Sequence, residues 1–251
     1  MFSLPPRLPP LPVLPVRGRD LALLLVAFGA AGCVHMVAGF FALGVGARLL
    51  APEGALAGLA PVAGLIVLTT LFMLSLVWVI ALRPYGLRLA DIGLRPTYST
   101  WYRLAVAVGL LCVPAFSVLN LGVQSLLDAP VENPQLRTLA PDGFSWTSLV
   151  VMLLLVGVLV PFAEEIVFRG LVFGWLRKHL RFAYAAPLSA IFFASVHMVW
   201  FLVPVLACMG LVLAAITERS GSLWPAIIVH GTFNSLMTIT FYTALASGAG
   251  F

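Results

Sequence analysis

Charged residues are what this sequence has least of. Only 9% of its 251 residues are charged, whereas 62% are hydrophobic, and the mean hydropathy is +1.10. A soluble globular domain carries about 25% charged residues, and so little polar surface could not cover a water-facing protein of this size. The composition therefore excludes an ordinary soluble enzyme, and the lack of charge also excludes a disordered chain. It predicts a polytopic integral membrane protein.

Cysteine and lysine are scarce as well. The three cysteines, Cys33, Cys112 and Cys208, each lie in an apolar segment without paired spacing. This pattern indicates packing residues rather than a disulfide framework or a thiolate metal site. The net charge of +5 comes from basic residues that are nearly all arginine and that lie between apolar runs. Such a distribution is typical of membrane topology signals, so we expect a lipid bilayer and no nucleic acid as a partner.

Long apolar runs dominate the rest of the chain. A helix needs about 20 apolar residues to cross a hydrocarbon core of about 30 Å. Seven runs meet or approach this length, namely 21–45, 57–82, 102–125, 146–176, 184–200, 203–217 and 223–247. The sequence therefore predicts an all-α fold: a membrane helical bundle of about seven transmembrane helices (six to eight), forming a single domain over residues 21–251.

Three segments differ from a simple span. The run 146–176 is too long for one straight span, and Pro161 is expected to kink it. The runs 184–200 and 203–217 are short and are separated by little more than Phe201-Leu202, which predicts a tight hairpin. Residues 1–20 contain six prolines and three arginines, a composition that favours an extended tail that does not pack.

The basic residues also predict the orientation of the chain. With the N-terminus in the cytoplasm, the outer loops carry only Arg48 and Arg137. The cytoplasmic ends then carry eleven basic residues: Arg7, Arg17, Arg19, Arg83, Arg88, Arg95, Arg103, Arg177, Lys178, Arg181 and Arg219. Because basic residues concentrate in cytoplasmic loops, this bias predicts a cytoplasmic N-terminus and an odd number of spans.

Three charged residues lie in the middle of one apolar run: Glu164, Glu165 and Arg169. A charged residue at the bilayer centre costs at least about 2.5–3.5 kcal/mol on insertion scales, so such residues are rare and usually functional. Glu165 and Arg169 are four residues apart and can form a supporting ion pair on one helix face. Glu164 lies about 100° away around the helix and is the carboxylate left available for chemistry. A purely structural network of the three charges is the alternative.

Two further polar pairs occur in later spans. His197 follows Phe193 by four residues, and Asn234 follows His230 by four, so each pair is expected on one helix face. The short hairpin can bring these residues beside Glu164. A carboxylate, two imidazoles and an amide include no strong nucleophile, but they can activate water and stabilise an oxyanion, as amide hydrolysis requires. Alternatively, Glu164, His197 and His230 could bind zinc.

These motifs, in this order, resemble those of a known family. Glu164-Glu165-Ile166-Val167-Phe168-Arg169 is similar to its Glu-Glu-x-x-x-Arg motif, Phe193 to His197 matches Phe-x-x-x-His, and His230 to Asn234 matches His-x-x-x-Asn. The chain thus resembles the CPBP family of CAAX-prenyl endopeptidases and of bacteriocin-processing and immunity proteins, also called Abi. The motif-bearing region, an expected catalytic core, covers about residues 145–240.

The resemblance implies an intramembrane endopeptidase in a bacterial inner (plasma) membrane, with an active site open to the cytoplasmic side. By analogy, Glu164 and His197 would activate water, while His230 and Asn234 would stabilise the oxyanion. Supporting positions would be Glu165, Arg169 and Phe193. The implied substrate is a membrane-associated or lipidated peptide or protein. No cofactor is required in this reading, with zinc as the alternative.

Two other functions are alternatives to hydrolysis. A non-catalytic protein, such as a bacteriocin-immunity protein, could hold a hydrophobic peptide in the same cavity. A transporter would need a two-sided pathway and usually repeated halves, whereas only one half of this chain carries charge within its spans. The sequence therefore favours a peptidase, with the peptide-binding protein as the alternative.

Overall fold

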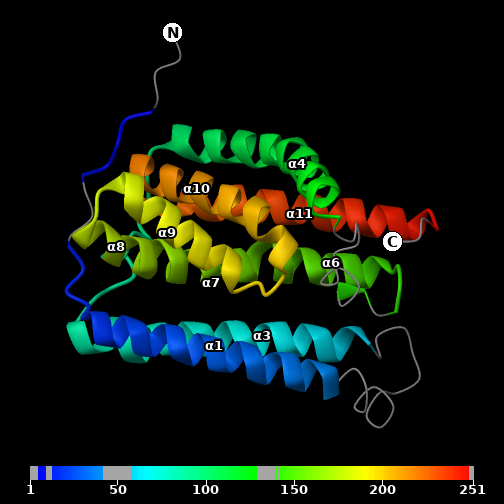
Figure 1. Ribbon diagram of the computed structural model, residues 1–251, viewed down its shortest axis with the longest axis horizontal. Helices are drawn as coiled ribbons and strands as arrows, with labels where there is room; N and C mark the ends of the chain where they lie inside the picture. The colour runs from blue at the N-terminus through cyan, green and yellow to red at the C-terminus, as the bar shows by residue number, and fades with distance from the viewer. Residues whose placement is uncertain (1–4, 10–12, 42–57, 129–138, 141, 249–251) are drawn as a thin grey trace.

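The computed structural model describes residues 5–9, 13–41, 58–128, 139–140 and 142–248, and of residues 31–41 only the backbone. This part of the chain contains no strand and forms seven helical passes that run in alternating directions (Figure 1). Four described segments are apolar and long enough to cross a membrane: Leu59–Tyr85, Ser99–Leu127, Trp146–His179 and Trp200–Ser220. The predicted all-α membrane bundle is confirmed.

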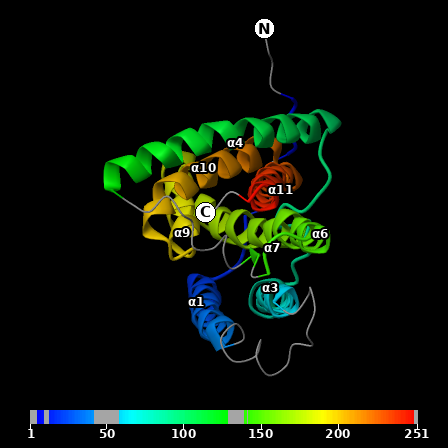
Figure 2. The same cartoon turned by 90° about the vertical axis from the view of Figure 1, so that its right-hand side faces the viewer.

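The passes are arranged in layers. α1 (Gly18–Phe41) and α3 (Leu59–Leu76) lie side by side at one edge of the molecule (Figure 2). At the opposite edge, α4 (Ser99–Leu127) crosses over α10 (Val203–Ser220) and α11 (Trp224–Ala246). The segment Trp146–His179 runs between these layers, so it is covered on both sides. We call this segment the central helix.

The central helix changes its hydrogen-bond pattern several times along its length. It consists of α6 (Trp146–Leu154), the π-helical stretch η4 (Leu155–Leu159), α7 (Val160–Glu165), the π-helical stretch η5 (Ile166–Phe173) and α8 (Gly174–His179). Ser145 caps its start, because its side chain accepts a hydrogen bond from the Ser148 N–H. The π-helical stretch η4 ends two residues before Pro161, the residue at which the sequence predicts a kink. Isolated π turns of this kind occur often at functional sites.

The hairpin after the central helix turns earlier than predicted. α9 spans Phe182–Ser195 and does not continue to residue 200. Residues 196–199 form the link, with Met198 at a positive φ of 57°, and the 3₁₀ turn Trp200–Leu202 leads into α10. The predicted boundary was wrong because the link is itself apolar, so hydropathy continues past the point where the helix ends.

Most of the basic residues lie at one end of the bundle, which we call the basic end. α1, α4, α9 and α11 begin at this end, and α8 and α10 end there, as does the turn Arg83–Tyr85 after α3 (Figure 1). Of the eleven basic residues that the sequence assigned to one side, six lie on these segments, and the other five lie in the tail and in the connections next to these segments: Arg7, Arg17, Arg88, Arg95 and Arg181. Arg48 and Arg137 fall outside the described residues.

The N-terminal tail is extended, as predicted, but the expectation that it does not pack was wrong. Leu14 and Val16 are only 4% and 2% exposed. The Trp101 indole N–H donates to the Pro6 carbonyl at 2.8 Å, and Arg7 forms an ion pair with Glu218 at 3.3 Å. Its apolar side chains, set between prolines, cover the helix ends at the basic end.

Arg95 connects the tail to the end of α10. Its guanidinium donates to the carbonyls of Pro9 and of Gly221, the latter at 2.9 Å. Burial in this contact lowers the pKa of Arg95. The tail is therefore part of the packed structure at the basic end.

Candidate active site

A buried ion pair forms the floor of the candidate site. Glu165 is 0% and Arg169 1% exposed, and Arg169 Nη1 lies 3.0 Å from Glu165 Oε1. The guanidinium also donates to the Gly210 carbonyl at 3.4 Å and lies 4.3 Å from the centre of the Phe193 ring. Because a buried charge is tolerated only when it is paired, these contacts lock the central helix to α9 and α10.

His230 connects this pair to the second glutamate. Its Nδ1 lies 2.9 Å from Glu165 Oε1, and its Nε2 lies 3.7 Å from Glu164 Oε2. An ionised carboxylate can only accept, so Nδ1 carries the proton in the contact with Glu165. This fixes the orientation of the ring and directs Nε2 toward Glu164. The sequence predicted the ion pair of Glu165 but not its contact with His230.

Glu164 and Glu165 differ in their access to solvent. The Glu164 side chain is 18% exposed, whereas that of Glu165 is fully buried. Among the described residues, no group donates a hydrogen bond to Glu164 Oε2. The 3.7 Å to His230 Nε2 is too long for a direct hydrogen bond, and Oε2 is itself buried, so the exposed part of Glu164 is the rest of its side chain. Glu164 is therefore the less buried of the two carboxylates, and its Oε2 has no hydrogen-bond donor in the described part of the chain.

His197 lies in the turn after α9, two residues beyond Ser195. The prediction that it shares a helix face with Phe193 was therefore wrong. Its Nδ1 donates to the Phe193 carbonyl at 2.9 Å, since a carbonyl can only accept. The Phe193 ring lies between the two imidazoles, with its centre 4.9 Å from that of His197 and 5.8 Å from that of His230. Phe193 thus joins His197 to the cluster around His230.

Asn234 contacts the backbone of the central helix. Its side-chain amide donates to the Val156 carbonyl at 3.1 Å, within η4. Sequence reasoning missed this contact, although Pro161, five residues after Val156, was a signal that a nearby carbonyl would need an outside donor. An amide nitrogen carries two hydrogens, and this contact uses one of them.

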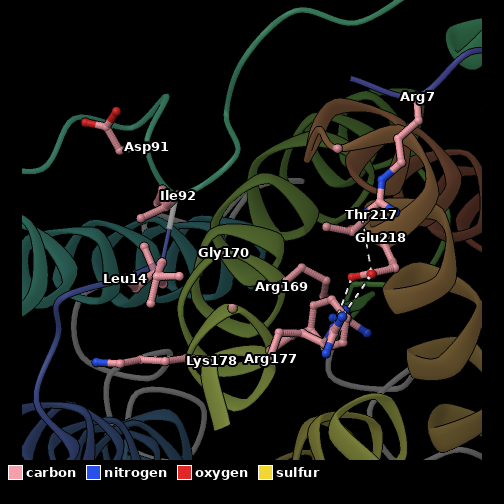
Figure 3. A pocket seen from close by; sticks show the side chains of 14 residues that line it. Arg7, Leu14, Asp91, Ile92, Arg169, Gly170, Arg177, Lys178, Thr217 and Glu218 are labelled. Carbon is pink, nitrogen blue, oxygen red and sulfur yellow. Dashed lines mark hydrogen bonds and ion pairs between the residues drawn. The ribbon is translucent and has the colours of Figure 1, made fainter. Parts of the chain in front are cut away.

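A cavity of about 170 Å³ lies at the basic end, and Arg169 forms part of its wall (Figure 3). The tail contributes Arg7 and Leu14 to the lining. Arg7 and Arg177, which both line the cavity, point at Glu218, at 3.3 Å and 3.2 Å. The buried ion pair thus borders a space at the end of the bundle where the tail docks. This cavity was not predicted.

The zinc alternative finds no ligand set in the described part of the chain. No three His, Cys, Asp or Glu side chains converge there in a way that could hold a metal ion, and this includes Glu164, His197 and His230. Because the residues do not fit a metal, we derive no step through one.

The fold and this cluster define a polytopic helical membrane protein with ionisable residues in its interior. Residues 146–236 match the family of type II CAAX prenyl endopeptidase Rce1-like proteins. A protein of Bacillus subtilis (strain 168) named "Putative membrane peptidase YdiL" is 28% identical over 88 residues, which are 35% of this chain and 36% of that protein. No solved structure matches the chain.

The matched region includes all three motifs, from Glu164 to Asn234. The match over this region supports the CPBP family that the motifs predicted. The chain spans about a third of the length of the curated relative that it matches.

Proposed function

We propose that this chain is an intramembrane peptidase that hydrolyses a peptide bond of a membrane-associated or lipidated peptide. The observation that carries the proposal is the position of Glu164 Oε2, 3.7 Å from His230 Nε2 and without a donor among the described residues. A water molecule between these two atoms would face a carboxylate able to take its proton. The family match over residues 146–236 supports the same class of reaction.

In the proposed mechanism, Glu164 removes a proton from the water while the water oxygen attacks the scissile carbonyl carbon. His197 would help to orient this water. The negative charge that develops on the carbonyl oxygen would be stabilised by the second N–H of Asn234 and by His230 in its imidazolium form, in which Nε2 donates to the oxygen while Nδ1 donates to Glu165. The intermediate then collapses: the carbon–nitrogen bond breaks, and Glu164 returns its proton to the leaving amine. The products are one new carboxylate and one new amine.

Glu165 has a positioning role in this proposal. Its contacts with Arg169 and His230 hold the imidazole in one orientation, so that Nε2 faces the reacting centre. Such preorganised donors act without having to reorganise during the reaction. Phe193, packed against both imidazoles, restricts the movement of their rings.

The test is cleavage of a quenched fluorescent, farnesylated peptide with a CAAX-type end by the full chain reconstituted in liposomes. Glu164→Gln keeps the size of the side chain but removes the base, and we expect turnover to fall by about 10²-fold or more. Glu218→Gln, the same change at the basic end, is the matched control. Wild-type turnover by a folded Glu164→Gln protein would refute the proposal. Binding without turnover in the wild type would favour the non-catalytic alternative.

We also propose that the basic end faces the cytoplasm of a bacterial plasma membrane. The bias of eleven basic residues toward that end supports this orientation. A phosphatase reporter, active only outside the cytoplasm, is expected to be active when fused after α11. An inactive phosphatase at that position, in a protein that is inserted normally, would contradict the proposed orientation.

A further inference from the structure

Pro161 removes a helical hydrogen-bond donor from the Val156 carbonyl of the central helix. A carbonyl accepts from the N–H four residues later in an α-helix and five residues later in a π-helix. For Val156 these donors would be Val160 and Pro161. The Val160 N–H donates instead to the Leu155 carbonyl, and a proline has no N–H. The Val156 carbonyl must therefore find its partner outside its own helix.

Asn234 supplies that partner from α11. Its side-chain amide lies 3.1 Å from the Val156 oxygen. Within a membrane, where water is scarce, a backbone carbonyl freed by proline is satisfied by a neighbouring helix or side chain. The proline and the asparagine, 73 residues apart in the sequence, thus form the two halves of one interaction.

The helices approach closely at this point, so that the short asparagine side chain can reach. A Cβ atom on Gly231 would lie 2.5 Å from the Gly157 carbonyl oxygen, and a Cβ atom on Gly157 would collide with Ser235 Oγ. Small residues on both helices allow the two backbones to meet. The contact is therefore built into both helices and involves more than one hydrogen bond.

This contact lies one to two helical turns from the candidate catalytic pair, since Glu164 follows Val156 by eight residues. Glu164 follows Pro161 by three residues, which is one helical turn, and His230 precedes Asn234 by four, also about one turn. The same two helices are joined again where His230 meets Glu164 and Glu165. Fixing the helices at Val156 and Asn234 therefore fixes the separation of Glu164 from His230.

We infer that Pro161 is a positioning residue of the active site and that it acts through Asn234. Pro161 frees the Val156 carbonyl, this carbonyl binds the Asn234 amide, and the resulting link sets the distance between Glu164 and His230. The kinetic part of this inference rests on the proposed peptidase activity. The hydrogen-bond coupling between the two residues does not, and it can be tested separately.

A double-mutant cycle on the full chain in detergent tests the coupling. Asn234→Leu removes the donor, and we expect the Tm to fall. Pro161→Ala restores an N–H five residues after Val156, so it is expected to raise the Tm of Asn234→Leu much more than that of the wild type. Asn120→Leu, which removes an amide on α4, serves as the control background. Pro161→Ala should shift the Tm of Asn120→Leu by the same amount as it shifts the Tm of the wild type. Additive shifts in the Asn234 cycle would overturn the inference.

Kinetics then test the positioning role. In Pro161→Ala the new N–H competes with Asn234 for Val156, so we expect kcat on the farnesylated peptide to fall about tenfold or more while KM and Tm are kept. The double variant should regain stability but not kcat. Coupled Tm values with an unchanged kcat would mean that the link is only structural, and the positioning role would be wrong. Coupled Tm values in a protein without peptidase activity would refute the proposed function and leave the coupling intact.

Discussion

Glu165 Oε1 accepts two hydrogen bonds at once, from Arg169 Nη1 at 3.0 Å and from His230 Nδ1 at 2.9 Å. One fully buried oxygen therefore accepts one hydrogen bond from within the central helix and one from α11. Replacing Glu165 by Gln would leave the Arg169 charge buried without a counter-charge. We expect a loss of stability of about 3–5 kcal/mol, because breaking a buried pair leaves one charge uncompensated. Thermal unfolding in detergent measures it.

The control for this prediction removes both charges. In the double variant Glu165→Gln, Arg169→Met, no unpaired charge remains, so most of the lost stability should return. If the double variant is as unstable as the sum of the two single variants, the pair contributes no coupling energy, and the description of Glu165 as the anchor of this site is wrong.

Gly231 allows a close backbone approach between α11 and the central helix. An added Cβ atom would lie 2.5 Å from the Gly157 carbonyl oxygen, which is backbone and cannot turn aside. We expect Gly231→Ala to destabilise the protein by about 1–3 kcal/mol, as overpacking does. Gly64→Ala is the control, since nothing lies within 4 Å of its Cβ position on α3. Equal Tm values for the two variants would contradict the close contact.

The helical architecture could be predicted from composition because the apolar runs coincide with the helices. The predicted run 223–247 and the observed α11, Trp224–Ala246, differ by one residue at each end. The end of α9 at Ser195 could not be predicted in the same way. Its turn is built from apolar residues, and a positive φ at Met198 leaves no mark in hydropathy.

The sequence motifs named the residues of the candidate site, but they predicted few of the contacts between these residues. Four-residue spacing predicted the contact between Glu165 and Arg169, since it arises within one helix. The contacts of His230 with both glutamates, and that of Asn234 with Val156, depend on how two distant helices pack. Spacing within one helix does not contain that information. The catalytic roles of Glu164, His197, His230 and Asn234 stay predictions.

The docked tail gives a prediction at the basic end. Trp101→Phe keeps most of the ring but removes the N–H that donates to the Pro6 carbonyl. We expect the tail to detach more often, with a stability loss of about 1 kcal/mol, and trypsin to cut faster after Arg17. Arg7→Gln is the control: its ion pair with Glu218 is half exposed on the arginine side and is worth about 0–1 kcal/mol. Wild-type cleavage rates in Trp101→Phe would show that the indole does not hold the tail.

Metal removal distinguishes the proposed water activation by glutamate from the zinc alternative. In the described part of the chain, no three His, Cys, Asp or Glu side chains form a ligand set, and His230 Nδ1 is already engaged by Glu165. We therefore expect turnover of the farnesylated peptide to be unchanged after dialysis against 1,10-phenanthroline, and elemental analysis to find no stoichiometric zinc. A non-chelating phenanthroline isomer controls for effects of the compound on the detergent micelle. Loss of turnover with the chelating isomer alone, restored by added zinc, would establish a metal enzyme and would require a ligand arrangement different from the one described.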